Sequence, residues 1–266
     1  MPAIATFVRR RPQATFWVIA YAISAGGYTL SRLYPSDAWV LVLWGIALAG
    51  ALITWTADGA AGLRTYLGRI VRWRAGARWY AVALLTPFAL QLVAAGLTLL
   101  SGSDVAVNVA WPDAGSVLAV FVFSVFTIAL GEEPGFRGFA LPRLLVGRSA
   151  ITASLILGML HALWHLPLVV GGDERPTILV NVAAAAVLFT WLYHHTAGSV
   201  LIAILLHASS DASAAVFGPL FADADAAIAG VWLAVAYVAL ALVVRGVAGA
   251  ELGRAAYEPG AQESGA

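Results

Sequence analysis

The amino-acid sequence predicts an all-α protein, a polytopic membrane helix bundle of about eight transmembrane helices. Three observations support this fold class: the composition, the length of the apolar runs and the placement of the arginines. The chain has 266 residues, of which 61% are hydrophobic and 11% are charged. Soluble domains are about 45–50% apolar and about 25% charged. The composition therefore indicates an integral protein whose main partner is the lipid bilayer.

Eight apolar runs are long enough to cross a bilayer, which requires about 20 predominantly apolar residues. They lie at residues 13–31, 38–57, 79–100, 115–135, 152–172, 177–194, 198–217 and 227–245. An even number of crossings places both termini on one side of the membrane. We expect a single transmembrane domain over residues 1–248, followed by a disordered cytoplasmic tail over residues 249–266.

The arginines indicate which side of the bundle is cytoplasmic. All 15 basic residues are arginine, and only Arg32 and Arg175 fall on the side away from the termini. Loops that carry an excess of arginine stay in the cytoplasm. The sequence therefore predicts a multi-pass protein of the cell membrane with both termini cytoplasmic. Residues 58–78 combine arginines with apolar residues and predict a helix on the inner membrane surface.

The composition also limits the chemistry that the chain can perform. The sequence contains no cysteine, which excludes disulfides, thiolate metal sites and cysteine nucleophiles. The formal net charge is +1, so the overall charge implies no nucleic-acid partner. Catalysis, if present, must depend on carboxylate, imidazole or hydroxyl groups.

The first group of charged residues ends the fourth apolar run and reads Glu132-Glu133-Pro-Gly-Phe-Arg137. A charged side chain at membrane depth costs about 2.5–3.5 kcal/mol, so it needs a partner or a wet cavity. Glu133 and Arg137 are four residues apart and can face each other on a helix. Glu132 then has no partner of its own, which suits a general base that takes a proton from water. The alternative is an ion pair that ends the helix at the headgroups.

Two further motifs carry histidines. His161 and His165 are four residues apart in the fifth run, and His207 and Asp211 have the same spacing in the seventh. Two imidazoles on one helix face suit a metal ion or the polarisation of water. A carboxylate one turn from an imidazole fixes the tautomer of that imidazole. The alternative for His161 and His165 is a histidine satisfied by a neighbouring carbonyl. His207 and Asp211 could instead satisfy each other at a helix interface. Together the three motifs predict one site assembled from three helices.

The three motifs can form one site only if the helices that carry them begin and end at suitable residues. Counted from the ends of the apolar runs, Glu132 lies near the inner face and His165 near the outer face. The two can meet only if the fourth helix continues past Glu132 to about Leu141 and the fifth begins near Ser154.

The order of the motifs resembles the CAAX prenyl protease and bacteriocin-processing family (CPBP, or Abi) of intramembrane metalloproteases. That family shows Glu-Glu-x-x-x-Arg, Phe-x-x-x-His and His-x-x-x-Asn or Asp on separate helices. The resemblance covers about residues 115–215, the motif-bearing core. The chain departs from the pattern at His161, which stands where phenylalanine is usual. The resemblance implies an eight-helix bundle whose site opens to the cytoplasmic half of the bilayer.

The activity that the resemblance implies is that of a metalloendopeptidase that hydrolyses a membrane-associated peptide or protein with activated water. By motif match, the catalytic residues would be Glu132, His165, His207 and Asp211, and the supporting residues Glu133, Arg137 and His161. Glu132 would be the base, assisted by His165, while His207 and Asp211 would stabilise the oxyanion or hold a metal. A divalent metal such as zinc, bound by Glu132, His165 and His207, is one of two arrangements that these residues leave open.

Two other classes of function fit parts of the sequence. One is a non-catalytic bacteriocin-immunity or scaffold protein of the same fold. The other is a proton-coupled transporter, in which buried carboxylates and histidines form a relay. Transporters often contain repeated halves, and residues 1–110 contain no counterpart of the motif-bearing half. The transporter therefore ranks behind the other two.

Overall fold

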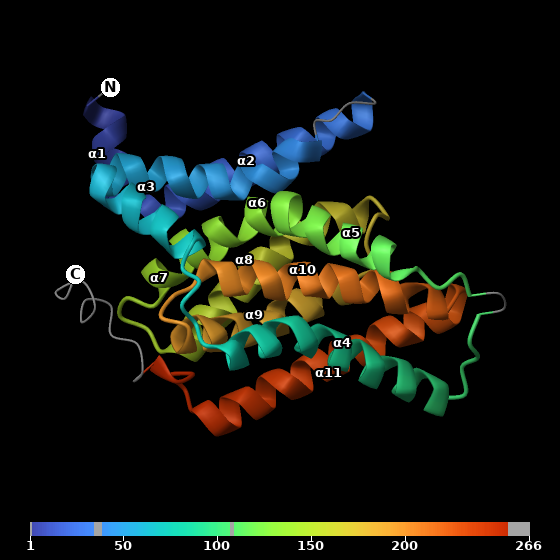
Figure 1. The fold of residues 1–266 in the computed structure, drawn as a ribbon. Helices are drawn as coiled ribbons and strands as arrows, with labels where there is room; N and C mark the ends of the chain where they lie inside the picture. The colour runs from blue at the N-terminus through green and yellow to red at the C-terminus, as the bar shows by residue number, and fades with distance from the viewer. Residues whose placement is uncertain (1, 35–38, 107–108, 255–266) are drawn as a thin grey trace.

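The computed structural model describes residues 2–34, 39–106 and 109–254, and all regular secondary structure in these ranges is helical. The elements are α1 (Pro2–Arg10), α2 (Pro12–Leu33), α3 (Trp39–Ile70), α4 (Ala77–Leu100), α5 (Ala114–Ser124), η1 (Val125–Ala129), α6 (Leu130–Glu133), η2 (Pro134–Ala140), α7 (Leu141–Leu144), α8 (Ala150–Val170), α9 (Thr177–His195), α10 (Val200–Phe217), η3 (Gly218–Leu220) and α11 (Asp223–Ala248). Figure 1 shows the long helices crossing the molecule from one end to the other.

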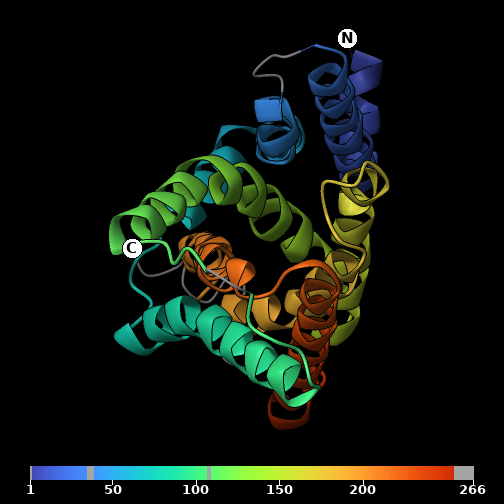
Figure 2. The same ribbon diagram turned by 90° about the vertical axis from the view of Figure 1, so that its right-hand side faces the viewer.

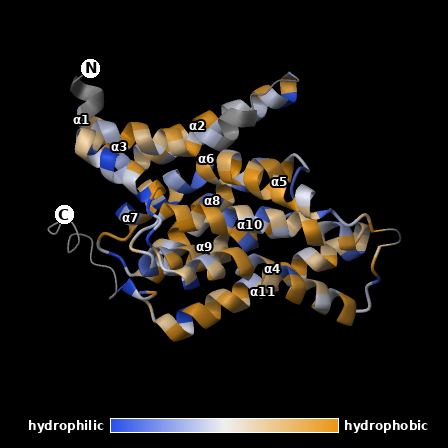
Figure 3. Ribbon diagram, viewed as in Figure 1, coloured by the Kyte–Doolittle hydropathy of each residue, from blue (hydrophilic) through white to orange (hydrophobic). Residues whose placement is uncertain are grey.

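Seven helices in the described part of the chain are long and apolar enough to cross a membrane. The first predicted span, residues 13–31, corresponds to α2, which is not among these seven. Some large apolar side chains are exposed on the outside of the bundle, among them Leu92, Leu118, Phe126 and Val247. Such an apolar outer surface is unfavourable in water and fits contact with lipid. Figure 3 shows hydrophobic residues along most of the helices. The predicted fold class, a membrane helix bundle of about eight spans, is confirmed.

The chain ends and the connections between helices are divided between two opposite ends of the bundle. One end, the terminal end, carries the start of α1, the end of α11 and the connections at residues 71–76, 145–149 and 196–199 (Figure 1). The opposite end, the distal end, carries the connections at residues 101–106, 109–113, 171–176 and 218–222. The shared end of α1 and α11 agrees with an even number of crossings.

The fourth predicted span is longer than its apolar run. Segments α5, η1, α6, η2 and α7 form one rod from Ala114 to Leu144. The rod begins where the Asp113 side chain accepts hydrogen bonds from the backbone N–H and the hydroxyl of Ser116, at 2.8 and 3.1 Å, and these donors lower the pKa of Asp113. The rod therefore continues past Glu132, and α8 begins at Ala150, so the condition for a shared site is met.

The middle of this rod contains two π-helical segments, η1 and η2, on either side of Glu132 and Glu133. Pro134 has no N–H to donate, yet its backbone stays helical at φ −58° and ψ −40°. Gly135 lies directly against the backbone of Ile46 in α3, where a Cβ atom would clash. Phe139 packs on Phe16 of α2, with ring centroids 4.6 Å apart. These contacts fix η2 against α2 and α3 and so hold the first motif in place.

The most enclosed helix is α10, which carries the third motif. Half of its apolar window is buried, compared with 17% for the rod and for α11. It packs against α4, α5, η1 and α9, and Figure 2 shows it surrounded by other helices. Its position explains how His207 and Asp211 can reach residues on several neighbours.

Two sequence predictions near the membrane surface are modified by the structure. The surface helix expected at residues 58–78 is the second part of α3, which changes direction at Gly59 and ends at Ile70. The left-handed φ of Gly59, +70°, is a conformation that glycine adopts without strain. Residues 249–254 of the expected tail pack on the bundle: Leu252 is fully buried, and Arg254 donates to the carbonyl of Leu145. The rest of that tail, residues 255–266, lies outside the described residues.

Candidate active site

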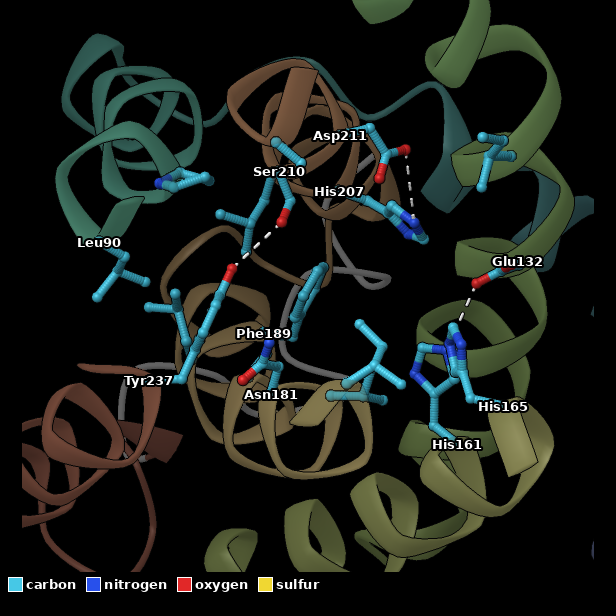
Figure 4. Close-up of a pocket in the computed structure, with 18 of the residues that line it drawn as sticks. Leu90, Glu132, His161, His165, Asn181, Phe189, His207, Ser210, Asp211 and Tyr237 are labelled. Atoms are coloured by element: carbon cyan, nitrogen blue, oxygen red, sulfur yellow. Dashed lines mark hydrogen bonds and ion pairs between the residues drawn. The ribbon is translucent and has the colours of Figure 1, made fainter. Parts of the chain in front are cut away.

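A cavity of about 350 Å³ lies among α4, α6, α8, α9, α10 and α11. All seven residues that the sequence analysis selected line it: Glu132, Glu133, Arg137, His161, His165, His207 and Asp211. Figure 4 shows Glu132, His161 and His165 on one side of the cavity, with His207 and Asp211 above them in the view. The structure therefore brings the three motifs together in one place.

Glu132 lies beside His161. The Oε2 atom of Glu132 is 3.4 Å from Nε2 of His161, and the two residues are only 2% and 4% exposed. Within the described part of the chain, neither that oxygen nor either ring nitrogen of His161 has a hydrogen-bond partner. Buried polar atoms are normally satisfied by protein or by ordered water. These atoms therefore require a polar occupant, and a water molecule held by Glu132 and His161 fits that need.

The neighbour of Glu132 differs from the one expected from the motif match. That match assigned the assisting role to His165 and only a supporting role to His161. In the structure, His161 is the imidazole next to Glu132, and its ring packs on Phe136 with centroids 4.0 Å apart. The packing shows that His161 fills an aromatic position while adding a polar edge toward Glu132.

His165 is held by a residue that the sequence analysis did not select. Nδ1 of His165 lies 2.7 Å from Oε2 of Glu174, which stands in the connection just before α9. Its ring is 5.1 Å from that of His161, measured between centroids. Glu174 could not be selected from the sequence, because no spacing rule links a loop carboxylate to a histidine on the preceding helix. The carboxylate orients the His165 ring beside His161.

The predicted ion pair between Glu133 and Arg137 is present and buried. Nη1 of Arg137 is 2.9 Å from Oε2 of Glu133, and the side chains are 1% and 0% exposed. The guanidinium also lies over the ring of Phe189, 3.8 Å from its centroid. This is a stacking arrangement that stabilises a desolvated cation.

Glu133 also holds His207, a role that the sequence analysis assigned to Asp211. Nδ1 of His207 lies 2.8 Å from Oε1 of Glu133. Nε2 of His207 is 3.9 Å from Oδ2 of Asp211, which is too long for a hydrogen bond. The expected fixing of the His207 tautomer by Asp211 is therefore corrected: Glu133 accepts from Nδ1 and leaves Nε2 facing Asp211 and the cavity.

Asp211 has its own donor on another helix. The hydroxyl of Ser124, the last residue of α5, donates to Oδ2 of Asp211. Ser124 is a second residue that the sequence analysis missed. The available signal was its position as one of the few polar side chains in an apolar run, eight residues before Glu132. Together Ser124 and Glu133 join the third motif to the rod.

The far side of the cavity is lined by residues outside the motifs. The hydroxyls of Ser210 and Tyr237 are 3.2 Å apart. Oδ1 of Asn181 is buried without a hydrogen-bond partner in the described ranges. The remaining lining is mostly apolar and includes Leu90 and Phe189. This side offers space for an apolar chain and an amide group that can bind a peptide bond.

The proposed metal ligands do not form a metal site here. Within the described ranges, no three His, Asp or Glu side chains are grouped so that they could hold a metal ion. This includes the set of Glu132, His165 and His207 considered above. These three side chains therefore do not fit a shared metal ion.

The cavity lies toward the distal end of the bundle. Its lining on α8 runs from His161 to Leu168, close to the end of that helix, and on α9 it begins at Ile178, the second residue. The resemblance implied a site open to the cytoplasmic half, and the arginines predict cytoplasmic termini. Both expectations stay predictions.

A known protein family matches the part of the chain that contains the three motifs. Residues 114–213 match the family described as Type II CAAX prenyl endopeptidase Rce1-like. The predicted family resemblance is confirmed. The Rce1-like segment begins with α5 and ends two residues after Asp211, so it contains all three motifs. It indicates a CAAX-protease-like intramembrane protease fold and a hydrolase of the protease kind. No matching relative was found among curated proteins.

The cavity extends beyond the Rce1-like segment. Residues of α4, including Pro87 and Leu90, and of α11, including Tyr237, line it but lie outside the matched range. The residues of the three motifs thus lie in the matched segment, while part of the surrounding wall comes from the flanking helices.

Proposed function

We propose that the protein is an intramembrane endopeptidase that hydrolyses a membrane-associated peptide or protein with water activated by Glu132. The observation that carries this proposal is a buried carboxylate oxygen of Glu132 that has no hydrogen-bond partner among the described residues. It lies beside His161 in a cavity shared with His165 and His207. A carboxylate in this position can take a proton from a water molecule that it holds. The partners are the lipid bilayer and the peptide substrate, and the setting is the cell membrane.

The reaction that this geometry supports has two stages. Glu132 takes a proton from the water, and the remaining hydroxide attacks the carbonyl carbon of the scissile peptide bond. When His207 carries both ring protons, it donates Nδ1–H to Glu133 and presents Nε2–H to the cavity, where a developing oxyanion can accept it. Glu132 then gives its proton to the leaving nitrogen, and the C–N bond breaks. Glu133 and Arg137 keep His207 in place throughout.

The proposal is tested by peptide cleavage in oxygen-18 water. The purified protein in lipid vesicles is incubated with synthetic peptides that carry an apolar anchor, and the products are analysed by mass spectrometry. We expect new carboxyl termini that contain one heavy oxygen atom. A preparation of Glu132→Gln, made in the same way, controls for contaminating proteases. Equal cleavage by both preparations, or none by the wild type, would favour a scaffold and overturn the proposal.

Replacing His161 by phenylalanine tests the role of the imidazole beside Glu132. Phenylalanine retains the packing on Phe136 but removes the polar edge toward the water. Loss of a hydrogen bond to a charged group costs about 1.5–3 kcal/mol, so we expect kcat to fall by about 10- to 100-fold. The measurement is the steady-state rate of peptide cleavage, with the thermal unfolding midpoint as a control for folding. An unchanged kcat would show that His161 acts only as a packing residue.

A further inference from the structure

Helix α2 binds the connection between α8 and α9 at the distal end of the bundle. Nη2 of Arg32 lies 2.5 Å from Oδ2 of Asp173 and donates to the carbonyl of Gly171 at 3.1 Å. The hydroxyl of Tyr28 donates to the same Asp173 oxygen at 3.1 Å and accepts from Nε of Arg32 at 3.2 Å. Figure 2 shows the end of α2 beside this connection. These four residues, Tyr28, Arg32, Gly171 and Asp173, form the distal cluster.

The distal cluster is directly next to the carboxylate that orients His165. Glu174 follows Asp173 in the chain, and its Oε2 lies 2.7 Å from Nδ1 of His165. The backbone N–H groups of Asp173 and Glu174 both donate to the carbonyl of Leu168, at 2.9 and 3.2 Å. Because these two bonds share one acceptor, the two residues can turn about it. The bonds from α2 supply a second point of attachment, which restricts that rotation.

Helix α2 approaches the connection more closely than a side chain at residue 171 would permit. A Cβ atom on Gly171 would overlap the hydroxyl of Tyr28 and would lie 2.9 Å from Nη2 of Arg32. The φ of Gly171 is −75°, which other residues adopt without strain. Glycine is therefore required at this position by the contact with α2 and not by the backbone conformation.

The distal cluster is suited to fix a position more than to stabilise the fold. The side chains of Arg32 and Asp173 are 49% and 42% exposed, and an exposed ion pair contributes little to stability. The bonds of the cluster nevertheless converge on the short connection that carries Glu174. The other arginine at this end, Arg175, is exposed in the same connection, and its side chain forms no hydrogen bond or ion pair within the described ranges.

We propose that Arg32 and Tyr28 are positioning residues of the active site. By holding the 171–176 connection they fix Glu174, and Glu174 fixes the ring of His165 beside that of His161. Helix α2 lies outside the Rce1-like segment, so a motif residue is positioned by a part of the chain that the family match does not cover. The consequence for cleavage rests on the proposed peptidase function, whereas the consequence for the orientation of His165 does not.

The orientation of His165 can be measured without any activity. The protein is labelled with nitrogen-15 histidine and placed in lipid nanodiscs, and the imidazole signals are recorded by NMR. The signal that is absent from His165→Gln belongs to His165, and Glu174→Ala gives its position without the carboxylate. Arg32→Gln removes the cation, and Gly171→Ala displaces Tyr28 without a change of charge. We expect both variants to move the His165 signal toward its position in Glu174→Ala.

Two further variants are the controls for this measurement. Arg175→Gln removes the same charge from the same connection but leaves the distal cluster intact. Arg32→Lys retains a cation that can pair with Asp173. We expect the His165 signal of both to stay near the wild-type position. An unchanged signal in Arg32→Gln and Gly171→Ala would overturn the proposal. An equal displacement in Arg175→Gln would also overturn it, because it would show a general effect of charge at this end.

The catalytic consequence is tested with the anchored synthetic peptides. We expect Arg32→Gln to lower kcat by about 5- to 30-fold, which corresponds to about 1–2 kcal/mol, and Arg32→Lys to retain most of the rate. KM should change little, because the distal cluster acts on the reacting groups only through Glu174 and His165. A wild-type kcat in Arg32→Gln would overturn the catalytic part of the proposal. Absence of cleavage by the wild type would contradict the peptidase function and leave the NMR result valid.

Discussion

Replacement of Glu132 by glutamine is expected to lower kcat for peptide cleavage by about 10²- to 10⁴-fold, the usual contribution of a general base. Glutamine has nearly the same shape as glutamate but cannot accept a proton from water. Glu132 is 2% exposed and forms no hydrogen bond through Oε2 within the described part of the chain. Removal of its charge therefore should not destabilise the bundle. The measurement is kcat on an anchored peptide, together with the thermal unfolding midpoint.

The neighbouring carboxylate provides a matched control for this prediction. Glu133 is the residue that binds Arg137 and His207, so Glu133→Gln weakens an ion pair and a histidine contact. We expect that variant to lower the unfolding midpoint, whereas Glu132→Gln retains it. A Glu132→Gln protein with the wild-type rate would contradict the proposed base. A biological phenotype that survives Glu132→Gln would indicate a scaffold.

The parts of the site that the sequence could predict are those set by spacing within one helix. Glu133 and Arg137 are four residues apart, and a helix of any orientation brings them together. The apolar runs likewise predicted most helices within a few residues, because the bilayer sets their length. Both features depend on local sequence alone.

The contacts between helices could not be predicted in this way. His207 binds Glu133 because α10 packs on α6 at a particular rotation about its axis, and His165 binds Glu174 because the connection after α8 folds back toward that helix. Spacing along a chain does not determine that rotation or the path of that connection. The same limit explains why Asp211, one turn from His207, was wrongly expected to fix its tautomer: Oδ2 of Asp211 binds Ser124 on another helix.

The depth of the site was also uncertain from sequence, for a physical reason. Hydropathy ended the fourth span at residue 135 because Glu132, Glu133 and Arg137 are charged. In the structure Glu133 and Arg137 neutralise each other, so the rod can continue to Leu144. Glu132 consequently lies within the rod and level with His161. A buried ion pair thus shifts a predicted membrane boundary.

Replacement of Arg137 by methionine is expected to lower the free energy of unfolding by about 3–5 kcal/mol, the usual effect of removing one partner of a buried ion pair. Methionine keeps an unbranched apolar stem but leaves the Glu133 carboxylate, which is fully buried, without its cation. Stacking on Phe189 is lost as well. The measurement is reversible unfolding in mixed micelles, followed by tryptophan fluorescence.

The double variant Arg137→Met with Glu133→Gln separates the two causes of that loss. If the uncompensated charge dominates, removal of both charges restores much of the stability, because buried ion pairs are often replaceable by neutral groups. If stacking and packing dominate, the double variant is as unstable as the single one. If the free energy of unfolding of Arg137→Met lies within about 1 kcal/mol of the wild-type value, the ion pair contributes no more than an exposed pair does. That result would contradict the prediction. Since His207 also depends on Glu133, recovery of stability in the double variant without recovery of cleavage would show that the pair serves both the fold and the position of the imidazole.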